Sequence, residues 1–245
     1  MTVPTPAPPA PDARRAVALA VGVTASVAFV VLRVVVALGG HDPLPLDIWW
    51  HDLMDDALTE PAILIAWVPA VAGGTIGMIV IGLVLILLLV WRRRRWDAAT
   101  LGIAMVIVVA IGATMAAVIA RVRPEDSLAE STATSFPSGH TAVATTVCVV
   151  LALVLRRGYV WALGVFWVVL MMWSRTYLQA HWLSDVVAGM LEGVAVSTLV
   201  WCAVEAVRDR RAVRSVPSPD PAPAHTTPGP TTPPAARPAE GSAIT

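Results

Sequence analysis

Residues 98–120 read AATLGIAMVIVVAIGATMAAVIA, a stretch without one charged side chain. The hydrocarbon core of a bilayer is about 30 Å thick, and an α-helix needs about 20 apolar residues to cross it. This stretch is therefore predicted to be a transmembrane helix. The whole chain fits that prediction, because 57% of its 245 residues are hydrophobic, 14% are charged and the mean hydropathy is +0.73. Such a composition argues against an ordinary soluble domain.

Further apolar stretches lie on both sides of residues 98–120. Together with it they predict six transmembrane helices, at 15–38, 61–91, 98–120, 138–155, 159–177 and 183–206. The stretch at 61–91 is too long for one straight helix, and Pro69 followed by Gly73 and Gly74 is expected to kink it. A pair of short half-spans is the alternative that the sequence leaves open there.

Arginine supplies all the basic side chains of this chain, which contains no lysine. The arginines that flank the apolar stretches form clusters at 14–15, 92–95, 156–157 and 208–214. Cytoplasmic loops of membrane proteins collect basic residues, and only an arrangement of six spans puts all these clusters on one side. We therefore expect both termini in the cytoplasm. The Arg-, Ala- and Pro-rich composition suggests a GC-rich bacterial genome, hence a bacterial cell membrane.

Two chain ends and one connecting segment complete the predicted organisation. Residues 1–13 and 215–245 are rich in proline and are predicted to be disordered, with the second as a cytoplasmic tail. Residues 14–214 are then the membrane domain. The segment LPLDIWWHDLMDDALTE at 44–60 mixes tryptophan with aspartate and predicts an amphipathic helix on the outer membrane surface. The predicted fold is all-α, a polytopic membrane helical bundle of six transmembrane helices plus one interfacial amphipathic helix.

Cysteines and overall charge give little indication of a cofactor or of a nucleic acid partner. Cys148 and Cys202 both lie inside apolar stretches, where we expect buried thiols rather than a disulfide or a metal site. The formal net charge is zero, so only the distribution of charge along the chain is informative. We expect no nucleic acid partner, while protein partners cannot be inferred.

Polar residues gather at the predicted outer end of the bundle, where charged groups near the bilayer usually have a function. Residues 135–140 read SFPSGH and open the predicted span at 138–155. A helix start offers free N–H groups and a positive dipole end, both of which favour a phosphate. Ser138 can add a hydroxyl donor, Gly139 leaves the approach open, and His140 can give a proton to a leaving oxygen. Taken alone, this segment is equally well explained as an ordinary helix start.

A second polar cluster combines a histidine with a carboxylate. Asp185 follows His181 by four residues, so both lie on one helix face. A carboxylate that binds one imidazole nitrogen fixes the tautomer and leaves the other nitrogen free to attack. Arg123 and Arg175, at the same end, carry planar donors that match phosphate oxygens. Together these residues indicate phosphoryl transfer, although each arginine alone would be explained by snorkelling.

These clusters resemble the signature of the type 2 phosphatidic acid phosphatase superfamily: K-x6-R-P, then P-S-G-H, then S-R-x5-H-x3-D. Residues 137–140 (PSGH) and 174–185 (SRTYLQAHWLSD) complete its second and third parts. The first part keeps Arg123-Pro124, but Ala116 stands at the lysine position. The resemblance implies an all-helical membrane phosphatase that needs no metal or other cofactor.

The resemblance also assigns roles to individual residues. His181 is implied as the nucleophile that takes the phosphoryl group, with Asp185 orienting it and His140 as proton donor and then base. Residues implied in phosphate binding are Arg123, Arg175, Ser138 and Gly139. Arg121, at the outer end of the 98–120 span, is our hypothesised replacement for the missing lysine. A loss of that charged donor without replacement is expected to cost about 2–4 kcal/mol of transition-state stabilisation.

Three functions remain open at this point. The first is hydrolysis of a lipid phosphate at the outer membrane face, with a polyprenyl pyrophosphate, phosphatidic acid or phosphatidylglycerophosphate as candidate substrates. The second is transfer of the phosphoryl group to an alcohol through the same phosphohistidine. The third is non-catalytic binding of a lipid phosphate, for which Ala116 is the supporting feature. Retention of both histidines and of Asp185 favours catalysis.

Overall fold

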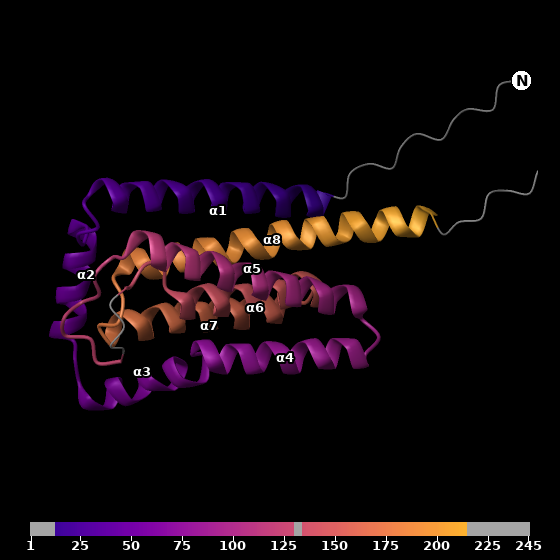
Figure 1. Cartoon of the computed structure of the whole chain (residues 1–245). Coiled ribbons are helices and arrows are strands. Elements are labelled where there is room, and N and C mark those ends of the chain that lie inside the picture. Colours follow the sequence, from indigo (N-terminus) through magenta and orange to yellow (C-terminus); the bar gives the residue numbers. More distant parts are fainter. Residues whose placement is uncertain (1–12, 130–133, 215–245) are drawn as a thin grey trace, which may run out of the picture.

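The computed structural model describes residues 13–129 and 134–214, and these fold into helices joined by short connections (Figure 1). The helices of the described part are α1 (Ala13–Leu38), α2 (Pro45–Asp56), α3 (Glu60–Ala72), α4 (Thr75–Trp91), α5 (Arg95–Ile119), α6 (Gly139–Leu155), α7 (Gly158–Tyr177) and α8 (Leu183–Arg214). The all-α prediction is confirmed for this part of the chain. Predicted disorder at 1–12 and 215–245 lies outside the described residues, whereas Ala13 already belongs to α1.

The long helices lie side by side, and α2 runs across one end of the bundle (Figure 1). Helix α8 occupies the interior and packs against α1, α5 and α6, which explains why so much of it is buried. The largest apolar core lies between α4, α5, α6 and α8. The apolar side chains of α1 and α4 that face away from the bundle are largely exposed, as expected where lipid replaces water.

The described part of the structure contains fewer helices able to cross a membrane than the six that hydropathy predicts. By length and composition, α1, α5, α7 and α8 can each cross a membrane. Helices α3 and α4 are bent by 48° at the expected glycines and form a fifth candidate if counted as one broken span. Helix α6, with 17 residues, is a shorter apolar helix. The structure therefore supports four or five spans, and the count of six stays a prediction.

The two cysteines and helix α2 lie largely as the sequence predicted. Cys202 is buried, Cys148 is half-buried, and both are free thiols. Helix α2 forms where an amphipathic helix was predicted, with exposed Trp49 on its outer side. Its inner side differs from the expectation of a helix lying on a surface, because Asp47 is only 1% exposed.

A close approach between α6 and α8 brings the start of α6 beside the start of α8. It requires glycine on α8: a Cβ atom added to Gly189 would lie 2.5 Å from the carbonyl oxygen of Ser138. One turn further on, a Cβ atom added to Gly193 would lie 2.7 Å from the carbonyl oxygen of Ala142. Neither oxygen can move without displacing the backbone of α6.

We expect Gly189→Ala to destabilise the protein by about 1–3 kcal/mol, because the extra methyl group overpacks a backbone contact. Thermal unfolding of the detergent-purified protein measures this as a lower midpoint temperature. Gly158→Ala is the matched control, since a Cβ atom there meets nothing within 4 Å. An unchanged midpoint for Gly189→Ala would show that the two helices are not in tight contact.

Candidate active site

The segment that follows α5 pairs with the segment that precedes α6. Ala120 ends α5 in a left-handed conformation with φ 46°. Beyond it, Val122 and Thr134 form an antiparallel bridge, and the N–H of Ser135 donates to the carbonyl of Arg121 at 2.9 Å. This pairing places both arginines of the R-V-R-P segment beside the first turn of α6.

The start of α6 is tied to the start of α8. The N–H of Ser138 donates to the carbonyl of Asp185 at 3.0 Å, and the Ser138 side chain is fully buried. Gly139 follows as the first residue of α6, and a Cβ atom added there would meet nothing within 4 Å. The helix start is therefore open on the side where the sequence predicts a phosphate.

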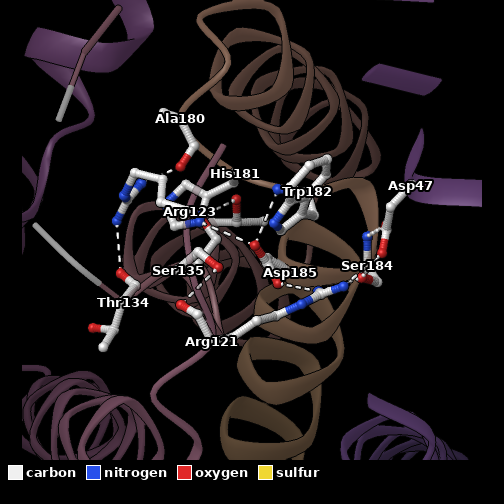
Figure 2. A network of polar contacts seen from close by, with 12 residues as sticks. Asp47, Arg121, Arg123, Thr134, Ser135, Ala180, His181, Trp182, Ser184 and Asp185 are labelled. Atoms are coloured by element: carbon white, nitrogen blue, oxygen red, sulfur yellow. Dashed lines mark hydrogen bonds and ion pairs between the residues drawn. The ribbon is translucent and has the colours of Figure 1, made fainter. Parts of the chain in front are cut away.

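His181 and Asp185 come together at the connection between α7 and α8 (Figure 2). The distance from His181 Nδ1 to Asp185 Oδ2 is 3.7 Å, which is longer than a hydrogen bond. The same carboxylate oxygen accepts the backbone N–H of Trp182 at 3.0 Å. Asp185 thus favours the tautomer with the proton on Nδ1 and leaves Nε2 with its lone pair.

A cavity of about 410 Å³ contains both predicted catalytic histidines. His140 and His181 line it from α6 and from the α7–α8 connection, together with Arg123 and Gly139. The wall contributed by α5 consists of small or aliphatic residues, which are Val108, Val109, Gly112, Ala113 and Ala116. The residue at the lysine position of the signature therefore faces the cavity, where its methyl group offers no charge.

The two predicted phosphate-binding arginines lie close to His181. Arg123 is 8% exposed and donates to the carbonyls of Ala180 and, at 2.8 Å, of Thr134. These bonds fasten the α7–α8 connection to the segment before α6. Arg175 is buried in the last turn of α7 and, like Ser138, is not among the residues that line the cavity.

The pKa of His181 is lowered from its ordinary value of 6.5, mainly because the imidazole is buried. The positive charges of Arg123 and Arg175 act in the same direction, whereas the contact with Asp185 raises the pKa. The net effect keeps the imidazole neutral near pH 7, which is the protonation state that a nucleophile requires.

We expect the acid limb of kcat/KM for phosphate release to lie below pH 6.5, the ordinary pKa of histidine. The sign follows from the environment: burial and two cations disfavour the imidazolium, so His181 stays neutral to a lower pH. A pH profile of kcat/KM reports the free protein and is the measurement required. An acid limb above pH 6.5 would contradict this assignment of the nucleophile.

Arg121 does not line the cavity, in contrast to Arg123. It is fully buried, and its five N–H groups all have acceptors within the protein. These acceptors are Asp185 Oδ1 at 2.6 Å, Ser184 Oγ at 2.7 Å, Asp47 Oδ2 at 2.7 Å, the Asp42 carbonyl at 3.1 Å and the His41 carbonyl at 3.3 Å. The prediction that Arg121 replaces the missing lysine stays a prediction, and this geometry leaves it no N–H group for a phosphate.

Asp47 and Ser184 are polar residues at this site that sequence reasoning missed (Figure 2). Asp47 belongs to a segment with several aspartates and matches no part of the signature. Ser184 lies inside the third part, at a position that the signature leaves unspecified. Only their burial and their bonds to Arg121 distinguish them from solvated neighbours.

The part of the chain that contains the candidate site is similar to a known protein family. Residues 121–209, from the end of α5 to the last part of α8, match the model of the PAP2 superfamily. This segment is therefore similar to the PAP2 superfamily. It includes all eight predicted site residues, whereas α1, α2 and the α5 wall of the cavity lie before it in the chain.

Two known proteins are similar to a larger part of the chain than residues 121–209. The chain is 36% identical, over 120 residues, to the undecaprenyl-diphosphatase of Sulfolobus acidocaldarius, a match that covers 46% of this chain and 58% of that protein. The fold is similar to the crystal structure of a transmembrane PAP2-type phosphatidylglycerolphosphate phosphatase from Bacillus subtilis, with a TM-score of 0.66 at 20% identity. That match covers 77% of this chain and 96% of the other. With the apolar helices, this similarity of fold supports a multi-pass membrane protein.

Proposed function

We propose that this protein is an integral membrane lipid phosphate phosphatase that works through a phosphohistidine on His181. The observation that carries the proposal is the shared cavity, which His140 and His181 line together. His181 has the carboxylate of Asp185 on its Nδ1 side, at 3.7 Å. A nucleophile, its orienting carboxylate and a second proton carrier are the parts that covalent phosphoryl transfer needs.

In the first step, Nε2 of His181 attacks phosphorus, and the bond from phosphorus to the leaving oxygen breaks. His140 gives its proton to that oxygen, which leaves as a lipid alcohol or, from a diphosphate, as the lipid monophosphate. Arg123 and Arg175 stabilise the negative charge on the other phosphate oxygens, together with the hydroxyl of Ser138 and the N–H group of Gly139 at the start of α6.

In the second step, His140 is neutral and takes a proton from water. The oxygen of that water attacks the phosphorus, the bond between phosphorus and Nε2 breaks, and inorganic phosphate leaves. His181 returns to its neutral form, and His140 keeps the proton for the next cycle. Asp185 stabilises the positive charge that develops on the imidazole of His181 in the first step.

A polyprenyl diphosphate is the substrate we favour, because the relative with 36% identity is an undecaprenyl-diphosphatase. The small residues of the α5 wall leave room in the cavity where the signature has a lysine. Phosphatidic acid and phosphatidylglycerophosphate are the monoester alternatives, and the structurally similar Bacillus subtilis protein is a phosphatidylglycerolphosphate phosphatase.

The proposed orientation places the site on the outer face of a bacterial plasma membrane, with both termini in the cytoplasm. It is supported by arginines that gather at the end of the bundle opposite to α2, where α1 starts and α8 ends (Figure 1). A second cavity at that end is lined by Arg93, Arg94, Arg95, Arg156 and Arg208. Basic residues of membrane proteins collect on the cytoplasmic side.

The proposed function is tested by phosphate release from undecaprenyl diphosphate, phosphatidic acid and phosphatidylglycerophosphate by the detergent-purified protein. EDTA is present, since the proposed residues need no metal ion. We expect release from at least one lipid, with the diphosphate preferred. Addition of an alcohol acceptor, followed by product analysis, distinguishes hydrolysis from phosphoryl transfer. The absence of release from all of these lipids would favour a binding role instead.

A further inference from the structure

Asp47 connects α2 to the proposed catalytic pair of His181 and Asp185. Helix α2 lies outside residues 121–209, the segment similar to the PAP2 superfamily. Asp47 lies on α2, which crosses the end of the bundle where His181 and Asp185 lie (Figures 1 and 2). Its carboxylate is 1% exposed, and both of its oxygens accept hydrogen bonds. A buried carboxylate with this many partners is fixed in place, so α2 cannot shift without disturbing those partners.

Arg121 is the first connection between the two carboxylates. One terminal nitrogen, Nη1, lies 2.6 Å from Asp185, and the other, Nη2, lies 2.7 Å from Asp47. All three side chains are at most 1% exposed, so solvent does not screen these contacts. The guanidinium is thus shared between a carboxylate of α2 and the carboxylate that orients the nucleophile.

Ser184 is the second connection, and it lies directly before Asp185 in the first turn of α8. Its backbone N–H donates to Asp47 Oδ1 and its hydroxyl to Asp47 Oδ2, both at 2.7 Å. A carboxylate at this point satisfies a free N–H group of the helix start and complements the positive end of the helix dipole. Asp47 therefore also fixes the turn of α8 from which Asp185 extends.

We propose that Asp47 is a positioning residue for phosphoryl transfer, which holds Asp185 and thereby His181 through Arg121 and Ser184. The inference rests on the proposed function. Asp47 does not line the cavity, so it acts on the nucleophile and not on the substrate. Without the carboxylate of Asp47, Arg121 pairs with Asp185 alone and attracts its negative charge more strongly. Asp185 then becomes a poorer acceptor for the Nδ1–H group of His181.

We expect the charge of Asp47 to act on the titration of His181 as well, because Arg121 connects Asp47 to Asp185. The charged groups that face His181 are Asp185 from α8, Arg175 from α7 and Arg123 from the segment that follows α5, and His140 of α6 shares the cavity. Asp47, on α2, adds a negative charge. Arg121 lies between Asp47 and Asp185, since it pairs with both carboxylates. Its removal disfavours the imidazolium of His181 and lowers its pKa, so the acid limb of activity moves to lower pH.

The experiment compares Asp47→Asn with the wild-type protein and with Asp52→Asn, a matched control at an exposed aspartate of the same helix. We expect Asp47→Asn to lower kcat between about tenfold and a hundredfold, with KM changed less than about threefold. The acid limb should move to lower pH by about half a unit or more. Asp47→Glu, which keeps the charge, should restore the position of the acid limb, and Asp52→Asn should behave as the wild type.

Two results would overturn the proposal. One is a wild-type kcat and a wild-type acid limb in Asp47→Asn. The other is that Asp47→Asn loses activity only in proportion to its loss of active protein, while the acid limb does not move. The amount of active protein is counted by phosphoenzyme formation. If Asp47→Asn does not fold, Ser184→Ala replaces it: kcat should fall severalfold at constant KM, and a wild-type kcat would contradict the proposal. Failure of the proposed function is separate, since the wild-type protein itself would then release no phosphate.

Discussion

His181→Ala is expected to lower phosphate release by at least about a thousandfold, because the variant lacks the proposed nucleophile that forms the covalent intermediate. His140 lies in the same cavity but is the proposed proton carrier, and the arginines carry no lone pair for attack. The measurement is phosphate release at saturating lipid, together with trapping of the phosphoenzyme from a substrate labelled in the transferred phosphate. The wild-type protein should give an acid-labile, alkali-stable label that His181→Ala lacks.

The matched control for this variant is His51→Ala. His51 is a histidine at the same end of the bundle, pairs with Asp126 at 3.2 Å and does not line the cavity. We expect it to retain label and turnover. A label that persists in His181→Ala would place the covalent bond on another residue, and turnover without any label in the wild type would indicate direct attack by water.

His140→Asn is expected to have the second largest effect, and the effect should depend on the leaving group. Without the acid, a lipid alcohol must leave as an alkoxide, which is far more basic than a phosphate. Hydrolysis of phosphatidic acid should therefore fall by about a hundredfold to ten-thousandfold. Formation of the phosphoenzyme from undecaprenyl diphosphate should fall much less, because the leaving lipid monophosphate needs little help from a proton.

The two substrates serve as each other's control in this experiment, since both use the same protein sample. Single-turnover measurements separate the first step from the attack of water, for which His140 is also needed. An equal loss of the first step with both substrates would contradict the role of His140 as acid and favour a role in binding phosphate.

Sequence alone determined the fold class and most of the candidate site. A helix in a membrane must satisfy its own backbone groups, so uncharged stretches such as 98–120 leave little choice of structure. The spacing of His181 and Asp185 predicted a shared helix face, and the two side chains do meet, although His181 lies in the α7–α8 connection just before α8 begins at Leu183. The motif at 137–140 marks a helix start, which the structure places at Gly139. These features depend on neighbours within a few residues, and such neighbours are visible in a sequence.

The count of spans illustrates the limit of local reasoning. Hydropathy divides the chain into six stretches, but α6 contains only 17 residues, and α3 and α4 are separated by a 48° bend. Helix length and bend angle depend on how each helix packs against its neighbours. Composition cannot specify them.

The tertiary structure alone decided what each charged residue contacts. Arg121 was predicted as a phosphate ligand from its position at a helix end, yet the fold surrounds it with five acceptors from three parts of the chain. Asp47 was one aspartate among several in an amphipathic segment, and packing of α2 across the bundle buries it beside Arg121. The buried carboxylate of Asp47 accepts a bond from Ser184, which lies 137 positions away in the sequence. Partners at such separations are set by packing, because burial without a partner would cost several kcal/mol.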